Sequence, residues 1–235
     1  MKYSFTGRIR YSETDQDARL TLDGLINYFQ DCSLFHSMEV DMGVDYLEEK
    51  KQAWMLTGWQ IIINDMPKLG DEVRTSTWAN EFRKCNGGRN FTMENQEGEL
   101  LAYANSYWCY IDMVTGRPTP FAEADGEKYQ PEPPMDMECA PKKIAWTGDG
   151  TAQKPYRILA HHIDTNHHVN NGQYVLMAMS YLPESFKIRQ MRAEYKRQAK
   201  LDDLITPVVH MEDGKCLVAL CNDKEKPYAI VEFQE

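Results

Sequence analysis

The chain contains two copies of one pattern, and this internal repeat limits the folds open to it more than any other feature. Four pairs of residues match, without a gap, at one offset of 149 positions, the distance from Asp15 to Asp164. The pairs are Arg8 with Arg157, Ile9 with Ile158, Asp15 with Asp164, and Leu20 with Val169. Matches that share one offset predict two related structural units in a single chain.

A second match lies further along each copy, at a smaller offset. Residues 68–73 correspond to residues 200–205, which lie 132 positions later. The first copy therefore holds 17 more residues than the second between the two matches, the difference between the offsets. We expect these extra residues between the helix and the later strands of the first copy.

Each copy is expected to hold one helix followed by antiparallel strands. Thr21 can cap a helix whose apolar residues recur three and four positions apart, from Leu22 to Phe29. In the second copy the apolar run 174–179 takes the same place. Apolar runs predict strands at 1–11, 54–63, 73–78, 89–94 and 100–111, while 43–51 is read as a loop or short helix. This order predicts a sheet wrapped around its helix.

The stretch from about 117 to 156 has a different composition and holds seven of the eleven prolines. Proline fixes φ and lacks a backbone donor, so this stretch is predicted to be a connector rather than part of a sheet. The predicted domains are accordingly residues 1–130 and 150–235, with the Pro-rich linker between them.

Polar residues able to do chemistry gather just before the second helix. Four of the six histidines lie within residues 161–168, together with Asp164 and Asn166. His168 could exchange a proton with water near neutral pH, Asn166 could orient the imidazole or the substrate carbonyl, and Asp164 could stabilise the imidazolium. The alternative is that these residues only cap the helix, since Asp and Asn are common N-caps.

A metal site is a rival interpretation of the same stretch. The ligand types present are those of His161, His162, Asp164, His167 and His168. Asparagine is a poor zinc ligand and no cysteine supports the set, so we predict no metal here.

Two motifs resemble a known family. The order Asp164-x-Asn166-x-His168-Val-Asn-Asn, followed by Tyr174, resembles the active-site segment of the acyl-acyl carrier protein (acyl-ACP) thioesterases of bacteria and plant plastids. Residues 194–199 resemble that family's second motif. The resemblance covers essentially the whole chain. It implies an α+β double hotdog that hydrolyses fatty acyl-ACP to free fatty acid without a cofactor, with Asp164, Asn166 and His168 in the catalytic network.

The second motif differs from the usual family residues after the Tyr-basic-basic triplet. The family usually has Glu followed by Cys or another small residue there, where this chain has Gln198 and Ala199. A covalent thiol route is therefore not expected. We predict attack by water, oriented by His168 and Gln198, with Glu194 as a further contributor if one strand carries 194 and 198 on the same face. Backbone N–H groups near Asn170 and Asn171 would receive the oxyanion.

The first copy lacks this chemistry. Asp17 stands opposite Asn166 and Arg19 opposite His168, so hydrolysis is expected only in the second copy. Asp15 remains and is expected to cap the first helix. Apolar residues of the first half, including Met55 and Trp59, are candidates for an acyl-chain pocket, although each is equally suited to a plain core.

The formal net charge of −10 argues against a nucleic-acid partner. ACP is itself acidic, so docking would need a local basic patch, for which a solvated strand face is the alternative reading. The candidate residues are Lys187, Arg189, Arg192, Lys196, Arg197 and Lys200.

No apolar run approaches the ~20 residues that span a bilayer, and residues 1–5 do not resemble a signal peptide. A cytoplasmic protein with six reduced cysteines is expected, and a homodimer is left open. Three alternative functions also remain open: an acyl-CoA thioesterase, a hotdog protein that binds acyl carriers without turnover, and, less favoured, a dehydratase.

Overall fold

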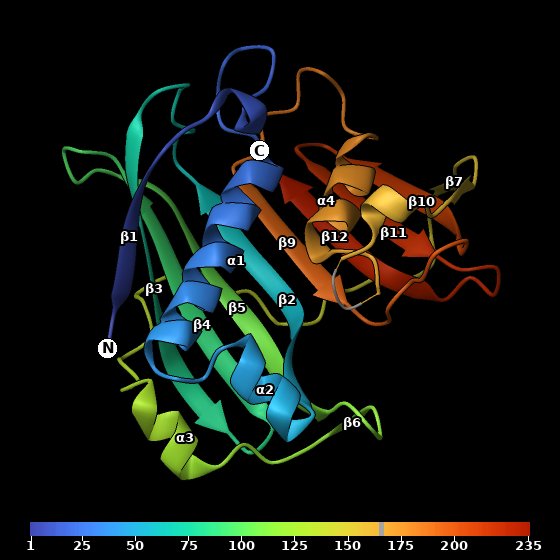
Figure 1. The fold of residues 1–235 in the computed structure, drawn as a ribbon. Coiled ribbons are helices and arrows are strands. Elements are labelled where there is room, and N and C mark those ends of the chain that lie inside the picture. Colours follow the sequence, from blue (N-terminus) through green and yellow to red (C-terminus); the bar gives the residue numbers. More distant parts are fainter. Residues whose placement is uncertain (165–166) are drawn as a thin grey trace. The chain divides into compact units, whose positions relative to one another are not determined.

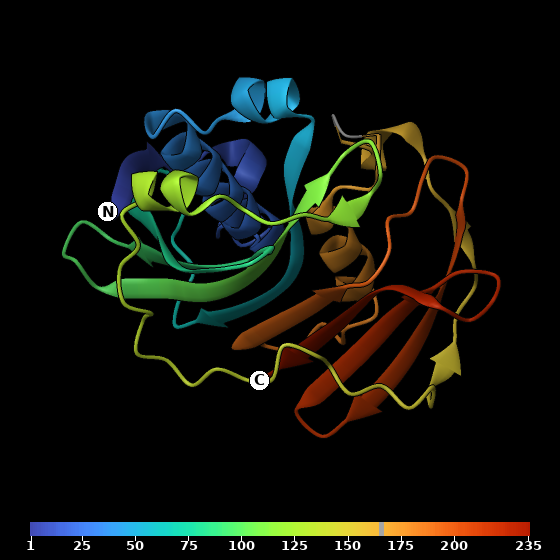
Figure 2. The ribbon, with the colours of Figure 1, turned by 90° about the horizontal axis from the view of Figure 1, so that it is seen from below.

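The computed structural model describes residues 1–164 and 167–235, and these form two compact units. The first unit holds Met1–Thr57 and Ile61–Cys139, and the second holds Gly58–Gln60 and Ala140–Glu235. Figure 1 shows the fold coloured along the sequence, and Figure 2 shows it from a second direction.

The first unit pairs a long helix with an antiparallel sheet. Its strands follow the order β1-β3-β4-β5-β2, and helix α1 lies over one face of the sheet (Figure 1). The short helix α2 follows α1. The elements are β1 (Tyr3–Arg8), a short 3-10 helix (Tyr11–Glu13), α1 (Leu22–Glu39), α2 (Val44–Lys50), β2 (Gln52–Ile63), β3 (Glu72–Arg83), β4 (Asn86–Glu94), β5 (Leu100–Asp112), β6 (Arg117–Pro118) and α3 (Glu123–Lys128).

Helix α1 begins where the sequence predicts. The Thr21 hydroxyl oxygen accepts a hydrogen bond of 3.0 Å from the backbone N–H of Gly24, which satisfies one donor of the first turn. Leu25, Ile26 and Phe29 are completely buried. The predicted helix with one buried face is therefore confirmed.

The second unit repeats this arrangement on a smaller scale. Its antiparallel sheet has the order β9-β12-β11-β10-β7, with β8 also paired to β10, and α4 contacts β11 and β12. Tyr174, Val175 and Ala178 form the buried face of α4. The elements are β7 (Thr151–Ala152), β8 (Tyr156–Arg157), a 3-10 helix (Ala160–His162), α4 (Asn171–Met179), β9 (Gln190–Tyr195), β10 (Leu204–Glu212), β11 (Lys215–Cys221) and β12 (Pro227–Gln234).

Matching hydrogen bonds confirm the internal repeat. The Ile9 N–H donates to the carbonyl of Asp71, and the Ile158 N–H donates to the carbonyl of Asp203, both at 2.9 Å. The isolated bridge Thr14↔Leu20 has its counterpart in Ile163↔Val169. The helix caps Thr21 and Asn170 also correspond. The two units are therefore copies at the level of individual backbone bonds.

The Pro-rich stretch is more structured than predicted. It contains the helix α3, which the sequence did not indicate, and three two-residue strands. Phe121 and Tyr129, only 9% and 1% exposed, pack into the core of the first unit, and Ile144 packs into that of the second. Apolar side chains between the prolines thus anchor the connector to both units. Among the helices that the structure describes, none is both long enough and apolar enough to span a bilayer.

Candidate active site

Backbone hydrogen bonds join the two ends of the loop before α4. The Asp164 N–H donates to the carbonyl of His168 at 2.9 Å, and the His167 N–H donates to the carbonyl of Asp164 at 3.1 Å. His167 adopts a positive φ of 60°, which allows the chain to reverse. Asn166, predicted to be catalytic, lies outside the described residues together with Thr165.

His168 stands at the end of this turn and is half-buried. Its Nδ1 is sealed from solvent and has no hydrogen-bond partner within residues 1–164 and 167–235. The next residue, Val169, donates its N–H to the carbonyl of Ala199 at 3.0 Å. The imidazole is thus carried on a backbone that is fixed to the second motif. Because Nδ1 is sealed, Nε2 is the nitrogen through which His168 can exchange a proton with a substrate.

The first turn of α4 uses most of its backbone donors internally. Asn170 caps the helix, since its Oδ1 accepts a 2.8 Å hydrogen bond from the Gly172 N–H. The Asn170 N–H donates to the carbonyl of His162 at 2.9 Å. The Asn170 N–H is therefore committed within the loop, and the oxyanion role stays a prediction for the N–H of Asn171.

Asn171 differs from Asn170. No acceptor for its N–H lies within the described part of the chain, and its carbonyl accepts a 3.1 Å hydrogen bond from the Tyr195 hydroxyl. Burial raises the pKa of Tyr195, so the hydroxyl keeps the proton that it donates. Tyr195 therefore fixes the peptide that follows the Asn170 cap.

The side chain of His162 binds the segment that leads into the loop. Its Nδ1 accepts a 3.0 Å hydrogen bond from the Leu159 N–H, while its ring lies 4.1 Å from that of His161. Burial, and then the neighbouring His161, lower the pKa of His162 and keep it neutral. In the described ranges, no group of three or more His, Cys, Asp or Glu side chains is arranged to hold a metal ion.

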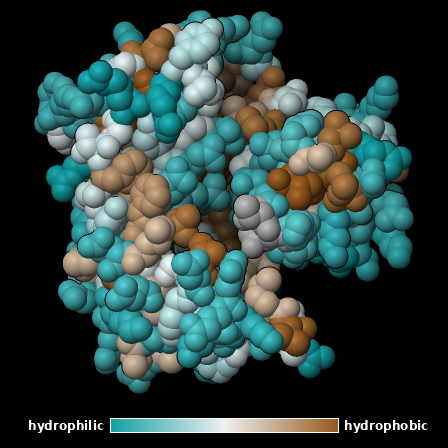
Figure 3. All heavy atoms as spheres, viewed as in Figure 1, coloured by the Kyte–Doolittle hydropathy of each residue, from teal (hydrophilic) through white to brown (hydrophobic). Residues whose placement is uncertain are grey.

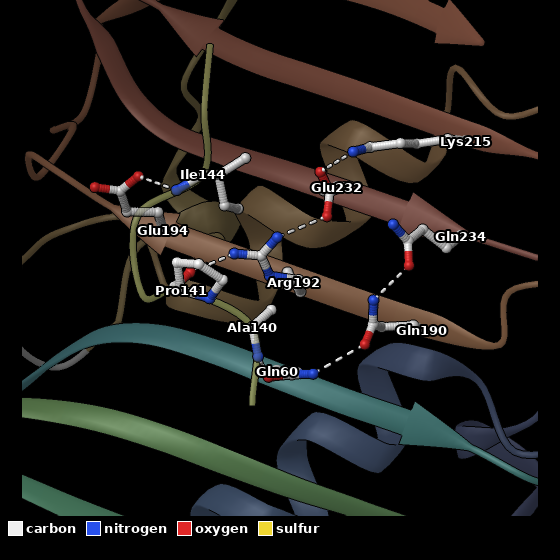
Figure 4. Close-up of polar contacts among 10 residues, drawn as sticks. All are labelled: Gln60, Ala140, Pro141, Ile144, Gln190, Arg192, Glu194, Lys215, Glu232 and Gln234. Carbon is white, nitrogen blue, oxygen red and sulfur yellow. Dashed lines mark hydrogen bonds and ion pairs between the residues drawn. The ribbon is translucent and has the colours of Figure 1, made fainter. Parts of the chain in front are cut away.

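The second motif is not one continuous strand. Strand β9 ends at Tyr195, and Gln198 is exposed in the segment that follows. Glu194 is buried, and one of its carboxylate oxygens accepts the Ile144 N–H at 2.9 Å (Figure 4). The other carboxylate oxygen pairs with Lys196 at 2.8 Å. The expectation that 194 and 198 face the same side is wrong, because the strand stops between them. The Glu194 carboxylate is occupied by these two partners.

Ala199 joins the two motifs. It is completely buried, its carbonyl accepts the Val169 N–H, and its own N–H donates to the Tyr174 hydroxyl oxygen at 2.8 Å. Gln198, the neighbouring residue, therefore lies beside the segment that carries His168. No role was predicted for Tyr174 or Tyr195 from the sequence, although their places in the two motifs were the available signal.

The six basic residues do not form one continuous exposed patch. Arg192 has a side chain only 13% exposed, pairs with Glu232 at 2.9 Å and donates to the carbonyl of Pro141 (Figure 4). It cannot take part in docking, because these contacts occupy it inside the second unit. The exposed residues stand in two groups, Lys187 and Arg189 before β9, and Lys196, Arg197 and Lys200 after it.

The corresponding loop of the first unit has a structural role. Asp15 accepts the N–H groups of Asp17 and Arg19 at 2.9 and 3.0 Å, whereas Thr21 caps α1. The expectation that Asp15 caps the helix is therefore wrong, since it closes the loop instead. Arg19, at the place of His168, donates to the carboxylate of Asp65 at 2.9 Å.

A hollow of about 610 Å³ lies beside Arg19 and Asp65 in the first unit. Arg19, which lines this hollow, corresponds in the repeat to His168, and no histidine is among the lining residues. Elsewhere, Met55 is a half-buried residue of the first unit, while Trp59, 2% exposed, is grouped with the second unit. Their assignment to an acyl pocket stays a prediction.

The fold places the chain in the class of tandem hotdog proteins. It resembles an acyl-ACP thioesterase from Bacteroides thetaiotaomicron with a TM-score of 0.89 and 20% identity, over 99% of this chain and 97% of that one. It resembles the 12:0-ACP thioesterase from Umbellularia californica with a TM-score of 0.84 and 19% identity, over 99% and 96% of the two chains. The predicted α+β double hotdog is confirmed.

Family comparison gives the particular assignment. The acyl-ACP thioesterase N-terminal domain matches residues 1–125 and the C-terminal domain of the same family matches residues 148–234. The chain belongs to the acyl-ACP thioesterase family. A palmitoyl-acyl carrier protein thioesterase from Gossypium hirsutum is 25% identical over an alignment of 224 residues that covers 88% of this chain and 54% of that protein. The chain spans about half the length of the curated relatives it matches.

Proposed function

We propose that the chain hydrolyses the thioester of fatty acyl-ACP and releases a free fatty acid. Family membership supports this proposal. The observation that carries it is the fixed position of His168, whose flanking segment is bonded to the second motif through Val169 and Ala199 at 3.0 Å. A group that moves a proton must be held in place. This backbone contact holds the segment that carries His168, whose counterpart in the first copy is Arg19.

The mechanism is direct attack by water. Water adds to the thioester carbonyl carbon while Nε2 of His168 takes its proton. The oxyanion is received by the N–H of Asn171 at the positive end of α4. The C–S bond then breaks and the leaving thiolate takes the proton back from His168. Asp164 fixes the loop through its backbone bonds to His167 and His168, Asn166 orients the imidazole or the thioester carbonyl, and the Gln198 amide holds the attacking water.

A thiol nucleophile has no part in this route. Ala199 occupies the family's usual Cys position. Burial raises the pKa values of Cys216 and Cys221 to about 11 each, so both thiols are protonated at neutral pH. Neither is suited to attack a thioester.

The partner in this proposal is ACP. Arg197 and Lys200 are exposed on either side of Ala199, which is bonded to the His168 segment. An acidic carrier bound there would present its thioester close to the imidazole.

The test compares matched acyl-ACP and acyl-CoA thioesters of several chain lengths with purified protein. We expect acid release from acyl-ACP with the higher kcat/KM. His168→Asn should lower kcat by ~10²-fold or more, the scale for a positioned acid–base group, whereas the adjacent exposed His167→Asn should not. Preference for CoA esters would favour the acyl-CoA thioesterase, and binding of acyl-ACP without release would favour the non-catalytic carrier-binding protein.

A further inference from the structure

One end of the second unit exposes leucines among basic residues. We call it the leucine face, and it is built from the three segments 157–159, 197–204 and 222–226. Its leucines are about half exposed: Leu159 at 49%, Leu201 at 53% and Leu204 at 49%. The basic side chains of the same segments are all exposed: Arg157, Arg197, Lys200, Lys224 and Lys226.

Hydrogen bonds hold the three segments together as one surface. Strand β8 pairs with the start of β10, and the Ile158 N–H donates to the carbonyl of Asp203 at 2.9 Å. The Tyr228 hydroxyl donates to the Asp203 carboxylate at 3.0 Å, and the Tyr228 carbonyl accepts the Arg197 N–H at 3.1 Å. Tyr228 lies on β12, which begins directly after the turn 222–226. All three segments therefore meet around Asp203 and Tyr228.

The leucine face is continuous with the proposed catalytic loop. Its residue Ala199 accepts the N–H of Val169, the residue after His168, at 3.0 Å. Its residue Leu159 donates its N–H to Nδ1 of His162 at 3.0 Å. A partner bound to this face would lie beside the segment that carries the imidazole.

Two acids of the leucine face are already committed. The Asp203 carboxylate accepts the Lys200 N–H at 2.9 Å as well as the Tyr228 hydroxyl, and Asp202 pairs with Arg157 at 3.5 Å. The remaining acids are exposed in the third segment: Asp223 and Glu225. Within the described part of the chain, three ammonium groups of the face have no carboxylate partner: those of Lys200, Lys224 and Lys226. They are available to the carboxylates of another molecule.

The first unit has an equivalent end, matched bond for bond. Segment 65–72 corresponds to 197–204, and in each the N–H of a lysine donates to the carboxylate three positions later, at 2.8 and 2.9 Å. Turn 95–99 corresponds to 222–226, and in each the side chain of the first asparagine accepts the N–H of the fifth residue, at 2.8 and 2.9 Å. The two ends can therefore be compared position by position.

The equivalent end of the first unit has the opposite charge. The leucine face carries five cations and four acids, whereas segments 8–10, 65–72 and 95–99 carry three cations and five acids. Acids replace cations at three matched positions, and one further acid replaces a leucine: Asp65 for Arg197, Glu97 for Lys224, Glu99 for Lys226, and Glu72 for Leu204. These four acids line the hollow of about 610 Å³. Adding Arg19, which pairs with Asp65, leaves this end negative.

We propose that the leucine face docks the acidic carrier protein, and that the acidic equivalent end keeps the carrier away from the copy that lacks His168. The inference rests on the proposed function, because it assigns the docking surface for that reaction's substrate. The lysines attract the carrier's carboxylates, and the leucines give an apolar contact that fixes its position. The same carboxylates are repelled by the acids of the first unit, which makes the choice between the two copies specific.

Calorimetry with holo-ACP, the carrier without an acyl chain, tests the leucine contact without any turnover. Leu201→Ser should weaken binding at least about threefold, the scale of exposing part of one leucine. Leu69→Ser is the matched control, because Leu69 holds the equivalent position in the first unit and is 44% exposed. It should bind as the wild-type protein does. Leu201→Ala serves if Leu201→Ser lowers the melting temperature.

The charged rim is tested in the same titration. Replacing Lys224 and Lys226 together with Glu should weaken holo-ACP binding about tenfold, because two exposed ion pairs become two repulsive pairs. The effect should shrink as salt is added.

Cross-linking tests the choice between the two units. A carbodiimide joins carboxylates of holo-ACP to nearby lysines, and mass spectrometry finds the linked positions. We expect links to Lys200, Lys224 and Lys226 and none to Lys68, the exposed counterpart of Lys200. Replacing Glu97 and Glu99 together with Lys should produce links to Lys68, because the repulsion is removed.

Links to Lys68 in the wild-type protein, or unchanged holo-ACP binding in Leu201→Ser, would overturn the inference. Holo-ACP binding that depends on Leu201, in a protein that hydrolyses no thioester, would refute the proposed function alone. Hydrolysis of acyl-ACP with holo-ACP binding unchanged by the leucine and lysine substitutions would refute the docking surface alone.

Discussion

The hydroxyl oxygen of Tyr174 accepts a hydrogen bond of 2.8 Å from the backbone N–H of Ala199, a buried bond that ties α4 to the second motif. The carbonyl of the same alanine holds the residue after His168. One small residue therefore receives a bond from the loop and gives one to the helix. Its side chain is dispensable for both contacts, which explains how the chain keeps this geometry without the cysteine usual in the family.

The first prediction concerns this bond. Tyr174→Phe removes the acceptor and leaves the Ala199 N–H buried and unpaired, at a cost of about 1–3 kcal/mol in the free energy of unfolding. Turnover per folded molecule should also fall, because the segment beside His168 loosens. Chemical denaturation and steady-state kinetics measure both. Tyr181→Phe, at a half-buried tyrosine just after α4, is the control and should change neither.

The repeat in the sequence predicted more of this geometry than any single motif did. Positions matched at offset 149 form equivalent bridges and helix caps, because the two members of each pair occupy the same place in their copies of the fold. The end of β9 was not predictable in the same way. Residues 190–198 contain no Pro or Gly to stop a strand; the bonds of Ala199 to Tyr174 and Val169 turn the chain away, and these are tertiary contacts.

The buried charges were also invisible in the sequence. Arg192 looked like one member of an exposed basic series, yet it pairs with Glu232 on the neighbouring strand β12. Glu232 also binds Lys215 at 2.7 Å, so the pairing depends on strand order (Figure 4). Figure 3 shows hydrophilic and apolar residues mixed on the surface. Composition predicts such a mixture but not which charges are buried. Periodicity predicts which face of a strand is buried, but not which buried charges find a partner.

The second prediction concerns thiol chemistry. Iodoacetamide at pH 8 should modify the exposed Cys139 while activity stays unchanged. Cys216 and Cys221, with pKa values of about 11, should react slowly, because a thiol with that pKa is ionised to only ~10⁻³ at pH 8. Mass spectrometry after partial alkylation gives the sites, and a thioester trapped on any cysteine during turnover would contradict the water-attack mechanism.

The third prediction compares the two loop aspartates. Asp15→Ala removes the acceptor for two backbone N–H groups and should cost about 0.5–1.5 kcal/mol per bond in the free energy of unfolding, with little change in turnover. Asp164→Ala should lower kcat by far more than its loss of stability explains. The comparison needs melting temperature and kcat for each variant. Loss of turnover in a fully stable Asp15→Ala protein would contradict this division of roles.

The fourth prediction concerns docking of the carrier. Replacing Arg197 and Lys200 with Ala should raise KM for acyl-ACP several-fold and weaken its dependence on salt, with kcat unchanged, because exposed charges act mainly on association. Lys187→Ala is the matched control at the other end of β9. A rise in KM for acyl-CoA of the same size would show that the pair binds the acyl substrate and not the carrier.

The last prediction concerns acyl-chain length and rests on Met55, a half-buried residue of β2 in the first unit. If Met55 limits the acyl pocket, Met55→Ala should shift the chain-length optimum of kcat/KM toward longer chains, and Met55→Phe should shift it toward shorter ones. A chain that does not fit holds the carbonyl away from His168, and small misplacements of reacting atoms are costly. Trp59→Phe should lengthen the preferred chain in the same way if Trp59 also lines the pocket. Met38→Ala, at a methionine that is 57% exposed on α1, is the control and should leave the profile unchanged. An optimum that stays fixed in all the Met55 and Trp59 variants, while their melting temperatures fall, would assign both residues to the core instead.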